Sequence, residues 1–123
     1  MESMKVLLVD DEEEFVHTLA ERLQLRGIDA LCSTKGEEAL ERIEADPPQV
    51  VVLDVLMPGI GGLEVLKRIK GRHPEIQVIL LTGRGSEKDG MEGTRLGAFD
   101  YLMKPLKIED LIKKMREALG QDQ

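Results

Sequence analysis

Four apolar segments that we expect to be buried strands are each followed by side chains suited to phosphoryl chemistry. In chain order they are 6–9 before Asp10 and Asp11, 50–53 before Asp54, 76–81 before Thr82, and 99–103 before Lys104. In an open α/β sheet, ligands bind in the crevice outside the carboxyl ends of the strands. We therefore expect three carboxylates, a hydroxyl and an ammonium to converge at one edge, where they would suit a divalent cation plus a phosphoryl group.

The types of these residues indicate how such a site would work. Clustered carboxylates repel one another and need a counter-charge, and Mg²⁺ is a hard cation that takes oxygen ligands while keeping several waters. Asp54 is the candidate nucleophile, because carboxylates form aspartyl-phosphate intermediates. Lys104 would add a mobile positive charge, and Thr82 would add a hydroxyl that can turn toward a phosphoryl oxygen.

Taken singly, each of these residues has an ordinary structural explanation. Asp10 and Asp11 could provide the cap and first-turn charge of a helix, and Asp54 could form a turn. Thr82 could be a strand-end hydroxyl, and Lys104 a solvated surface lysine. The occurrence of all of them at one predicted sheet edge is what favours a functional site.

Composition limits the classes of function that the chain can have. Its 123 residues suffice for one domain, which we place at residues 1–123. A net charge of −7 and an aromatic content of 2% argue against direct binding of nucleic acids or anionic membranes. Cys32 is the single cysteine, which fits a reducing cytoplasm, where we expect the protein to act. No apolar run approaches the roughly 20 residues that a membrane span needs.

Apolar runs alternate with segments of helical period along the chain, and this pattern predicts a parallel sheet with helices on both faces. The expected strands are 6–9, 28–32, 50–54, 76–81 and 99–103, and the expected helices begin near residues 12, 37, 63, 86 and 108. The fourth helix, Ser86–Leu96, contains Gly90 and Gly93. Each glycine costs about 1 kcal/mol relative to alanine in a helix interior, so we expect this helix to open locally more often than the fifth helix.

At these residues the chain resembles a bacterial response-regulator receiver domain, the acceptor half of two-component signalling. The matching stretches are VLLVDDE (6–12), VVVLDVLMPGIGGLEVL (50–66), VILLTG (78–83) and GAFDYLMKP (97–105). The resemblance implies an α/β fold of the flavodoxin-like type. In this three-layer sandwich, a five-stranded parallel sheet in the order 2-1-3-4-5 is covered by five helices.

The resemblance also implies roles for the residues of the acidic edge. Asp54 is then the phosphoacceptor. Asp11 and Asp54 bind Mg²⁺ directly, together with the backbone carbonyl of Leu56, and Asp10 contributes through a water molecule. Lys104 pairs with the phosphoryl group.

Further roles follow from the same resemblance. Thr82 and the backbone N–H of Gly83 hold phosphoryl oxygens, and the peptide bond between Lys104 and Pro105 is cis. Thr82 and Tyr101 form the switch that reports activation to the face made by the fourth helix, the fifth strand and the fifth helix.

Two positions depart from the pattern that many members of the family show. Apolar Leu56 lies two positions after the acceptor, where many members carry a polar group, and Arg84 lies two positions after Thr82. Because a polar side chain near the acceptor can orient the attacking water, we expect slow loss of the phosphoryl group.

The resemblance implies a signalling switch that catalyses only its own phosphorylation and dephosphorylation. Its expected partners are a sensor histidine kinase or phosphotransfer protein and an output domain or downstream protein, with homodimer formation on activation as one form of output. An unphosphorylated pseudo-receiver is an alternative, although such proteins usually lose acidic or lysine positions. A haloacid-dehalogenase-type phosphatase is a second alternative, but its nucleophile lies in an Asp-x-Asp pattern and this chain has no cap segment.

Overall fold

The computed structural model describes residues 4–121 and contains a five-stranded sheet and five helices. The strands are β1 (Lys5–Val9), β2 (Asp29–Ser33), β3 (Val50–Asp54), β4 (Gln77–Thr82) and β5 (Asp100–Met103). The helices are α1 (Glu13–Gln24), α2 (Gly36–Ala45), α3 (Gly62–Arg72), α4 (Glu87–Arg95) and α5 (Ile108–Ala118). Each element lies within a few residues of its predicted position.

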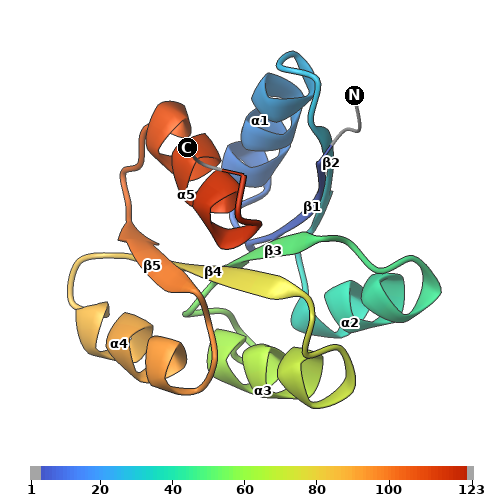
Figure 1. Cartoon of the computed structure of the whole chain (residues 1–123). Helices are drawn as coiled ribbons and strands as arrows, with labels where there is room; N and C mark the ends of the chain where they lie inside the picture. Colours follow the sequence, from blue (N-terminus) through green and yellow to red (C-terminus); the bar gives the residue numbers. More distant parts are fainter. Residues whose placement is uncertain (1–3, 122–123) are drawn as a thin grey trace.

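The strands pair in parallel in the order β2-β1-β3-β4-β5, which confirms the flavodoxin-like topology (Figure 1). Helices α1 and α5 cover one face of the sheet, and α2, α3 and α4 cover the other. The register places Val9 opposite Leu53 on the central pair β1 and β3. The carboxyl ends of these two strands are therefore level, and the residues that follow them emerge side by side.

Two apolar layers hold the sheet between its helices. Every residue of β3 is buried, as expected for a central strand with helices on both faces. The layer beneath α1 and α5 includes Leu8, Leu23 and Leu111, and the layer on the opposite face includes Leu53 and Leu66. Strands β1, β3 and β4 contribute side chains to both apolar layers, and they anchor the loops at their carboxyl ends.

Helix α4 lies close to the sheet at both of its glycines. A Cβ added at Gly93 would lie 2.0 Å from Leu80 Cδ1 and 3.2 Å from Leu63 Cδ2. A Cβ added at Gly90 would lie 2.7 Å from Thr82 Cγ2 and 2.8 Å from the Tyr101 ring. Close packing of α4 on β4 and β5 therefore requires both glycines, at the expense of helix propensity.

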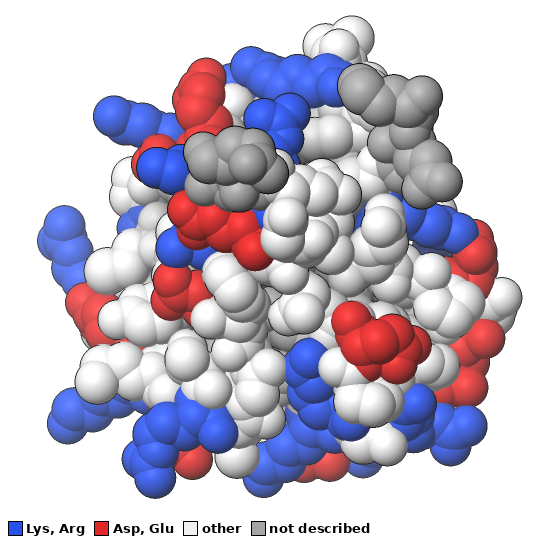
Figure 2. All heavy atoms as spheres, in the orientation of Figure 1, with Lys and Arg blue, Asp and Glu red and all other residues white. Residues whose placement is uncertain are grey.

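Within residues 4–121, no helix is both long enough and apolar enough to cross a membrane. Figure 2 shows basic and acidic side chains interspersed on the face seen in Figure 1, with other residues between them. This face therefore carries no continuous basic surface of the kind that nucleic-acid backbones require.

Candidate functional site

The three predicted carboxylates form one cluster at the carboxyl edge of the sheet. Asp10 follows β1, Asp11 comes next, and Asp54 ends β3, and one oxygen from each lies within 4.8 Å of the others. Asp10 is 1% exposed and Asp54 is 8% exposed, whereas Asp11 is exposed to solvent. The level ends of β1 and β3 explain this proximity, because Asp10 and Asp54 are the next positions in the paired register.

Backbone hydrogen bonds orient the two buried carboxylates. Asp10 Oδ1 accepts a hydrogen bond from the N–H of Glu12 at 3.0 Å, and Asp54 Oδ1 accepts a longer one from the N–H of Leu56 at 3.4 Å. Each contact joins an aspartate side chain to the backbone two residues later, which is the hydrogen bond of a local turn at the end of the strand. The second oxygen of each carboxylate lies near the Lys104 ammonium, at 2.7 Å for Asp10 and 3.8 Å for Asp54.

The Lys104 ammonium neutralises part of this cluster. Its Nζ lies 2.7 Å from Asp10 Oδ2, 2.7 Å from Glu12 Oε1 and 3.8 Å from Asp54 Oδ2. It also lies 4.7 Å from the centre of the Phe15 ring, within the range of a cation–π contact. Asp10 Oδ2 is buried, and the ammonium beside it compensates its charge.

The surroundings shift the proton affinities of Asp54 and Lys104. Burial, together with the neighbouring charge of Asp10, raises the pKa of Asp54 to about 6, and the Lys104 ammonium opposes this rise. Burial alone would lower the pKa of Lys104, but hydrogen bonds to Asp10 and Glu12 outweigh it and leave the pKa raised. Lys104 therefore stays charged at neutral pH, and Asp54 is more basic than an ordinary aspartate.

The donor set fits a hard divalent cation. Two buried carboxylates and one exposed carboxylate supply oxygen ligands, and the exposed side of the pocket leaves room for the waters that Mg²⁺ retains. The raised pKa of Asp54 reflects burial beside a like charge, a situation that a bound cation relieves. Asp10, Asp11 and Asp54 are thus the side chains that could hold the metal.

The remaining predicted site residues make their contacts outside the carboxylate cluster. Thr82 is fully buried, and its hydroxyl lies 3.5 Å from the carbonyl oxygen of Leu102. The N–H of Gly83 donates to the hydroxyl of Ser86 at 2.8 Å. Tyr101 is half-buried and packs against the position of Gly90 on α4. The peptide bond between Lys104 and Pro105 is cis, and the side chains of Leu56 and Arg84 are exposed.

Sequence reasoning missed three residues of this region. Glu12 and Phe15 contact Lys104, and Ser86 contacts Gly83. The only available signal for Glu12 was its place beside the acidic pair. Ser86 was readable as the start of a helix, but its bond to Gly83 depends on the path of the loop between them.

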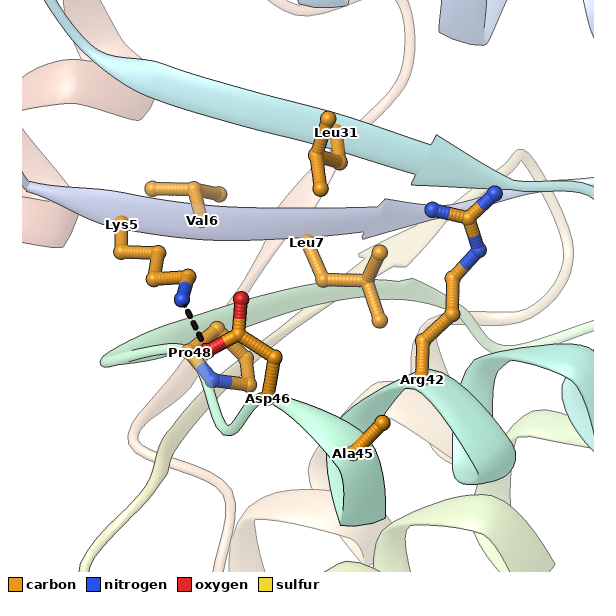
Figure 3. Close-up of a pocket in the computed structure, with 8 residues that line it drawn as sticks. All are labelled: Lys5, Val6, Leu7, Leu31, Arg42, Ala45, Asp46 and Pro48. Carbon is orange, nitrogen blue, oxygen red and sulfur yellow. Dashed lines mark ion pairs between the residues drawn. The ribbon is translucent and has the colours of Figure 1, made fainter.

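A separate hollow lies toward the amino end of β1, between β2 and α2 (Figure 3). It is lined by Leu7, Leu31, Arg42 and Pro48, among others, and an ion pair between Lys5 and Asp46 borders it. Its lining is largely apolar, and none of the clustered carboxylates contributes to it. The chemistry of the acidic edge therefore does not involve this hollow.

A doubly wound parallel sheet with three carboxylates and a lysine at its carboxyl edge defines a class of protein. The sequence matches the response regulator receiver domain over residues 6–116. The chain belongs to this family of two-component signalling domains.

Two bacterial relatives illustrate the match. Response regulator MprA of Mycobacterium tuberculosis is 37% identical over 117 residues, which cover 95% of this chain and 51% of MprA. The transcriptional regulatory protein CpxR of Escherichia coli is 40% identical over 115 residues, which cover 94% of this chain and 49% of CpxR. The chain thus spans about half the length of these relatives.

Solved structures show the same fold. The receiver domain of NtrX from Brucella abortus superposes with a TM-score of 0.89 at 32% identity, covering 95% of this chain and 99% of that one. A receiver domain protein from Clostridium thermocellum superposes with a TM-score of 0.90 at 30% identity, covering 96% and 95%.

Proposed function

We propose that this chain is a phosphoacceptor switch in which Asp54 takes a phosphoryl group from a partner histidine kinase or phosphotransfer protein. The observation that carries the proposal is the position of Asp54. Its carboxylate is buried, lies within 4.8 Å of two further carboxylates, and has the Lys104 ammonium 3.8 Å from Oδ2. Membership of the receiver family supports this reading.

The reaction is an in-line displacement at phosphorus. An oxygen of Asp54 attacks, the new P–O bond forms as the P–N bond to the partner's phosphohistidine breaks, and the electron pair of that bond leaves with the imidazole nitrogen, which is then protonated. The nucleophile is the Asp54 carboxylate, because carboxylates form aspartyl-phosphate intermediates. Asp10, Asp11 and Asp54 would hold Mg²⁺, which would supply positive charge against the transferred group, and hydrolysis of the acyl phosphate would later restore Asp54.

Three groups are proposed to hold the phosphoryl oxygens. Lys104 is 3.8 Å from Asp54, so a short movement of its side chain brings the ammonium against a phosphoryl oxygen on that residue. The Thr82 hydroxyl would turn from the carbonyl of Leu102 toward the phosphoryl group, and the Gly83 N–H would donate to it. We propose that Asp11 and Asp54 ligate Mg²⁺ directly with the carbonyl of Leu56, and that Asp10 does so through water.

The output of the switch is proposed to be the face formed by α4, β5 and α5. Thr82 and Tyr101 both border Gly90 of α4, so a turn of the Thr82 hydroxyl changes the packing against this helix. CpxR, which is named as a transcriptional regulatory protein, and the response regulator MprA are both about twice as long as this chain, which supports coupling to an output domain or a downstream protein. Homodimer formation on activation and action in the cytoplasm remain proposals.

Phosphorylation by a small donor tests the assignment. Incubation with acetyl phosphate and Mg²⁺ is expected to add one base-labile phosphate per chain, detected by intact mass. Asp54→Asn should abolish this uptake, whereas Asp29→Asn, an exposed aspartate away from the cluster, should leave it unchanged. Undiminished uptake by Asp54→Asn would refute the assignment.

The same experiment separates the alternatives. Mg²⁺ binding without any phosphate uptake, even from a kinase, would indicate an interaction module. Steady turnover of a small phosphomonoester would indicate a phosphatase.

A further inference from the structure

Ser86 makes a pair of contacts in the loop that leads from β4 to α4. It is 2% exposed, and its hydroxyl accepts a hydrogen bond from the N–H of Gly83 at 2.8 Å and donates one to the carbonyl of Gly83 at 2.9 Å. The Ser86 backbone N–H also donates to that carbonyl at 3.1 Å. A buried polar side chain thus closes the loop onto the first residue after β4.

The N–H of Gly83 emerges beside the phosphoacceptor strand. The carbonyl of Leu81 accepts from Val55, next to Asp54, whereas the carbonyl of Thr82 accepts from Lys104 on the β5 side. Because successive backbone groups of a strand point to opposite neighbours, this alternation directs the Gly83 N–H back toward the β3 side. It is therefore the first N–H beyond the paired ladder that can serve a group attached to Asp54.

We propose that Ser86 is a positioning residue whose hydroxyl holds the Gly83 N–H while Asp54 is unmodified and is displaced by a phosphoryl oxygen when Asp54 is phosphorylated. This inference rests on the proposed function. One backbone donor cannot make two short, aligned hydrogen bonds at once, so binding a phosphoryl oxygen requires the Ser86 contact to break.

Displacement of Ser86 would reach α4 directly. Ser86 is the residue that precedes α4, and its carbonyl accepts hydrogen bonds from Asp89 at 3.1 Å and from Gly90 at 3.2 Å. Gly85, immediately before it, has a φ of +90°, a conformation that glycine adopts without strain. Movement of Ser86 thus changes the first turn of α4, the same turn that packs on Thr82 and Tyr101 through Gly90.

The affinity of the full chain for beryllofluoride, a phosphoryl mimic, tests this role in the presence of Mg²⁺. Ser86→Ala removes the competing acceptor and should bind beryllofluoride about two- to tenfold more tightly by calorimetry, the range that one net hydrogen bond supplies. Its affinity for Mg²⁺ alone should be unchanged, because Ser86 lies outside the carboxylate cluster. The control is Ser33→Ala, another buried serine, whose hydroxyl has no hydrogen-bond partner among residues 4–121.

Hydrogen exchange and NMR supply readouts that do not depend on affinity. In the absence of beryllofluoride, the Gly83 amide should exchange faster in Ser86→Ala than in the unmodified chain, and Ser86→Thr, which keeps the hydroxyl, should restore protection. In the unmodified chain, a fluorine-to-proton NOE should link bound beryllofluoride to the Gly83 amide. This measurement does not depend on the folding of any variant.

Equal or weaker beryllofluoride affinity in Ser86→Ala, or the absence of that NOE from a saturated complex, would overturn the role of Ser86 while leaving the phosphoacceptor assignment intact. Failure of the unmodified chain to bind beryllofluoride at all would overturn the proposed function and the role of Ser86 with it.

Discussion

Lys104 and Glu12 are separated by 92 positions in the chain, yet their side chains meet at 2.7 Å above the acidic cluster. The same ammonium lies 2.7 Å from the buried carboxylate of Asp10. Glu12 is largely exposed, so its pair with Lys104 contributes little to stability. The contact with Asp10 is different, because without it a buried carboxylate would face Asp54 with no compensating charge.

Lys104→Gln should therefore destabilise the metal-free protein. We expect a loss of about 1–3 kcal/mol in the free energy of unfolding, the range for a buried polar group that loses its partner. Millimolar Mg²⁺ should recover most of this loss, because a ligand of the folded state stabilises it by mass action. The measurement is urea unfolding followed by far-UV dichroism, since the chain contains no Trp.

The control for this prediction is Lys67→Gln, a change at an exposed lysine on α3, which should stay within about 0.5 kcal/mol of the unmodified protein. A loss of stability that Mg²⁺ does not reduce would show that Lys104 is not the counter-charge of the cluster.

The raised pKa of Asp54 predicts a pH dependence of stability in the metal-free protein. The pKa is about 6 in the folded state against 3.8 ordinarily, so between these values the folded state binds more protons than the unfolded one. Stability should therefore fall as pH rises from about 4 to about 6, by at most about 3 kcal/mol from this group. Asp54→Asn should flatten the profile in this window. An unchanged profile, measured by urea unfolding in chelator, would contradict the raised pKa.

Replacing a helix glycine by alanine should have opposite effects on stability at two positions, one on α4 and one on α3. Gly93→Ala should destabilise the protein by about 1–3 kcal/mol, because its Cβ would lie 2.0 Å from the fully buried Leu80 side chain and overpack the interface. Gly71→Ala on α3 has nothing within 4 Å of the added Cβ and should stabilise by up to about 1 kcal/mol. Thermal unfolding checks both changes. Stabilisation by Gly93→Ala would show that α4 does not need this close approach.

The apolar side chain of Leu56 leads us to expect slow loss of phosphate from Asp54. Leu56 is 60% exposed and its N–H reaches Asp54 Oδ1 at 3.4 Å. Its apolar side chain offers no group that could orient an attacking water. Leu56→Asn should speed loss of phosphate roughly three- to tenfold, less than the about hundredfold effect of full general base catalysis. The decay is followed by intact mass.

Leu25→Asn, at a strongly exposed leucine in the turn after α1, is the matched control and should leave this decay unchanged. If Leu56→Asn loses phosphate no faster than the unmodified chain, Leu56 does not determine the lifetime of the phosphoryl group.

The strands were predictable from patterns that are local in sequence, and the family resemblance then supplied their order and the carboxylate cluster. Continuous apolar runs such as Val50–Leu53 mark central strands, and the strand order follows from the family resemblance. Once that order is set, the level register of Val9 and Leu53 brings Asp10 and Asp54 together without further information.

Side-chain choices among several partners were not predictable in the same way. Lys104 could reach several carboxylates, and only its path over Phe15 selects Asp10 and Glu12. The need for glycine at position 93 likewise depends on where the Leu80 side chain lies. The sequence alone showed that Gly93 lowers helix propensity, but it did not show the close packing against Leu80.

The acidic edge draws on positions from Asp10 to Lys104, brought together by three different strands and the loops that follow them. No short segment of the chain contains it. A preparation of this protein can therefore be assayed for correct folding by its binding stoichiometry alone, since molecules that have lost the register of β1 and β3 keep all their carboxylates yet present no pocket. The number of beryllofluoride ions bound per chain at saturation would then count the native molecules in the sample.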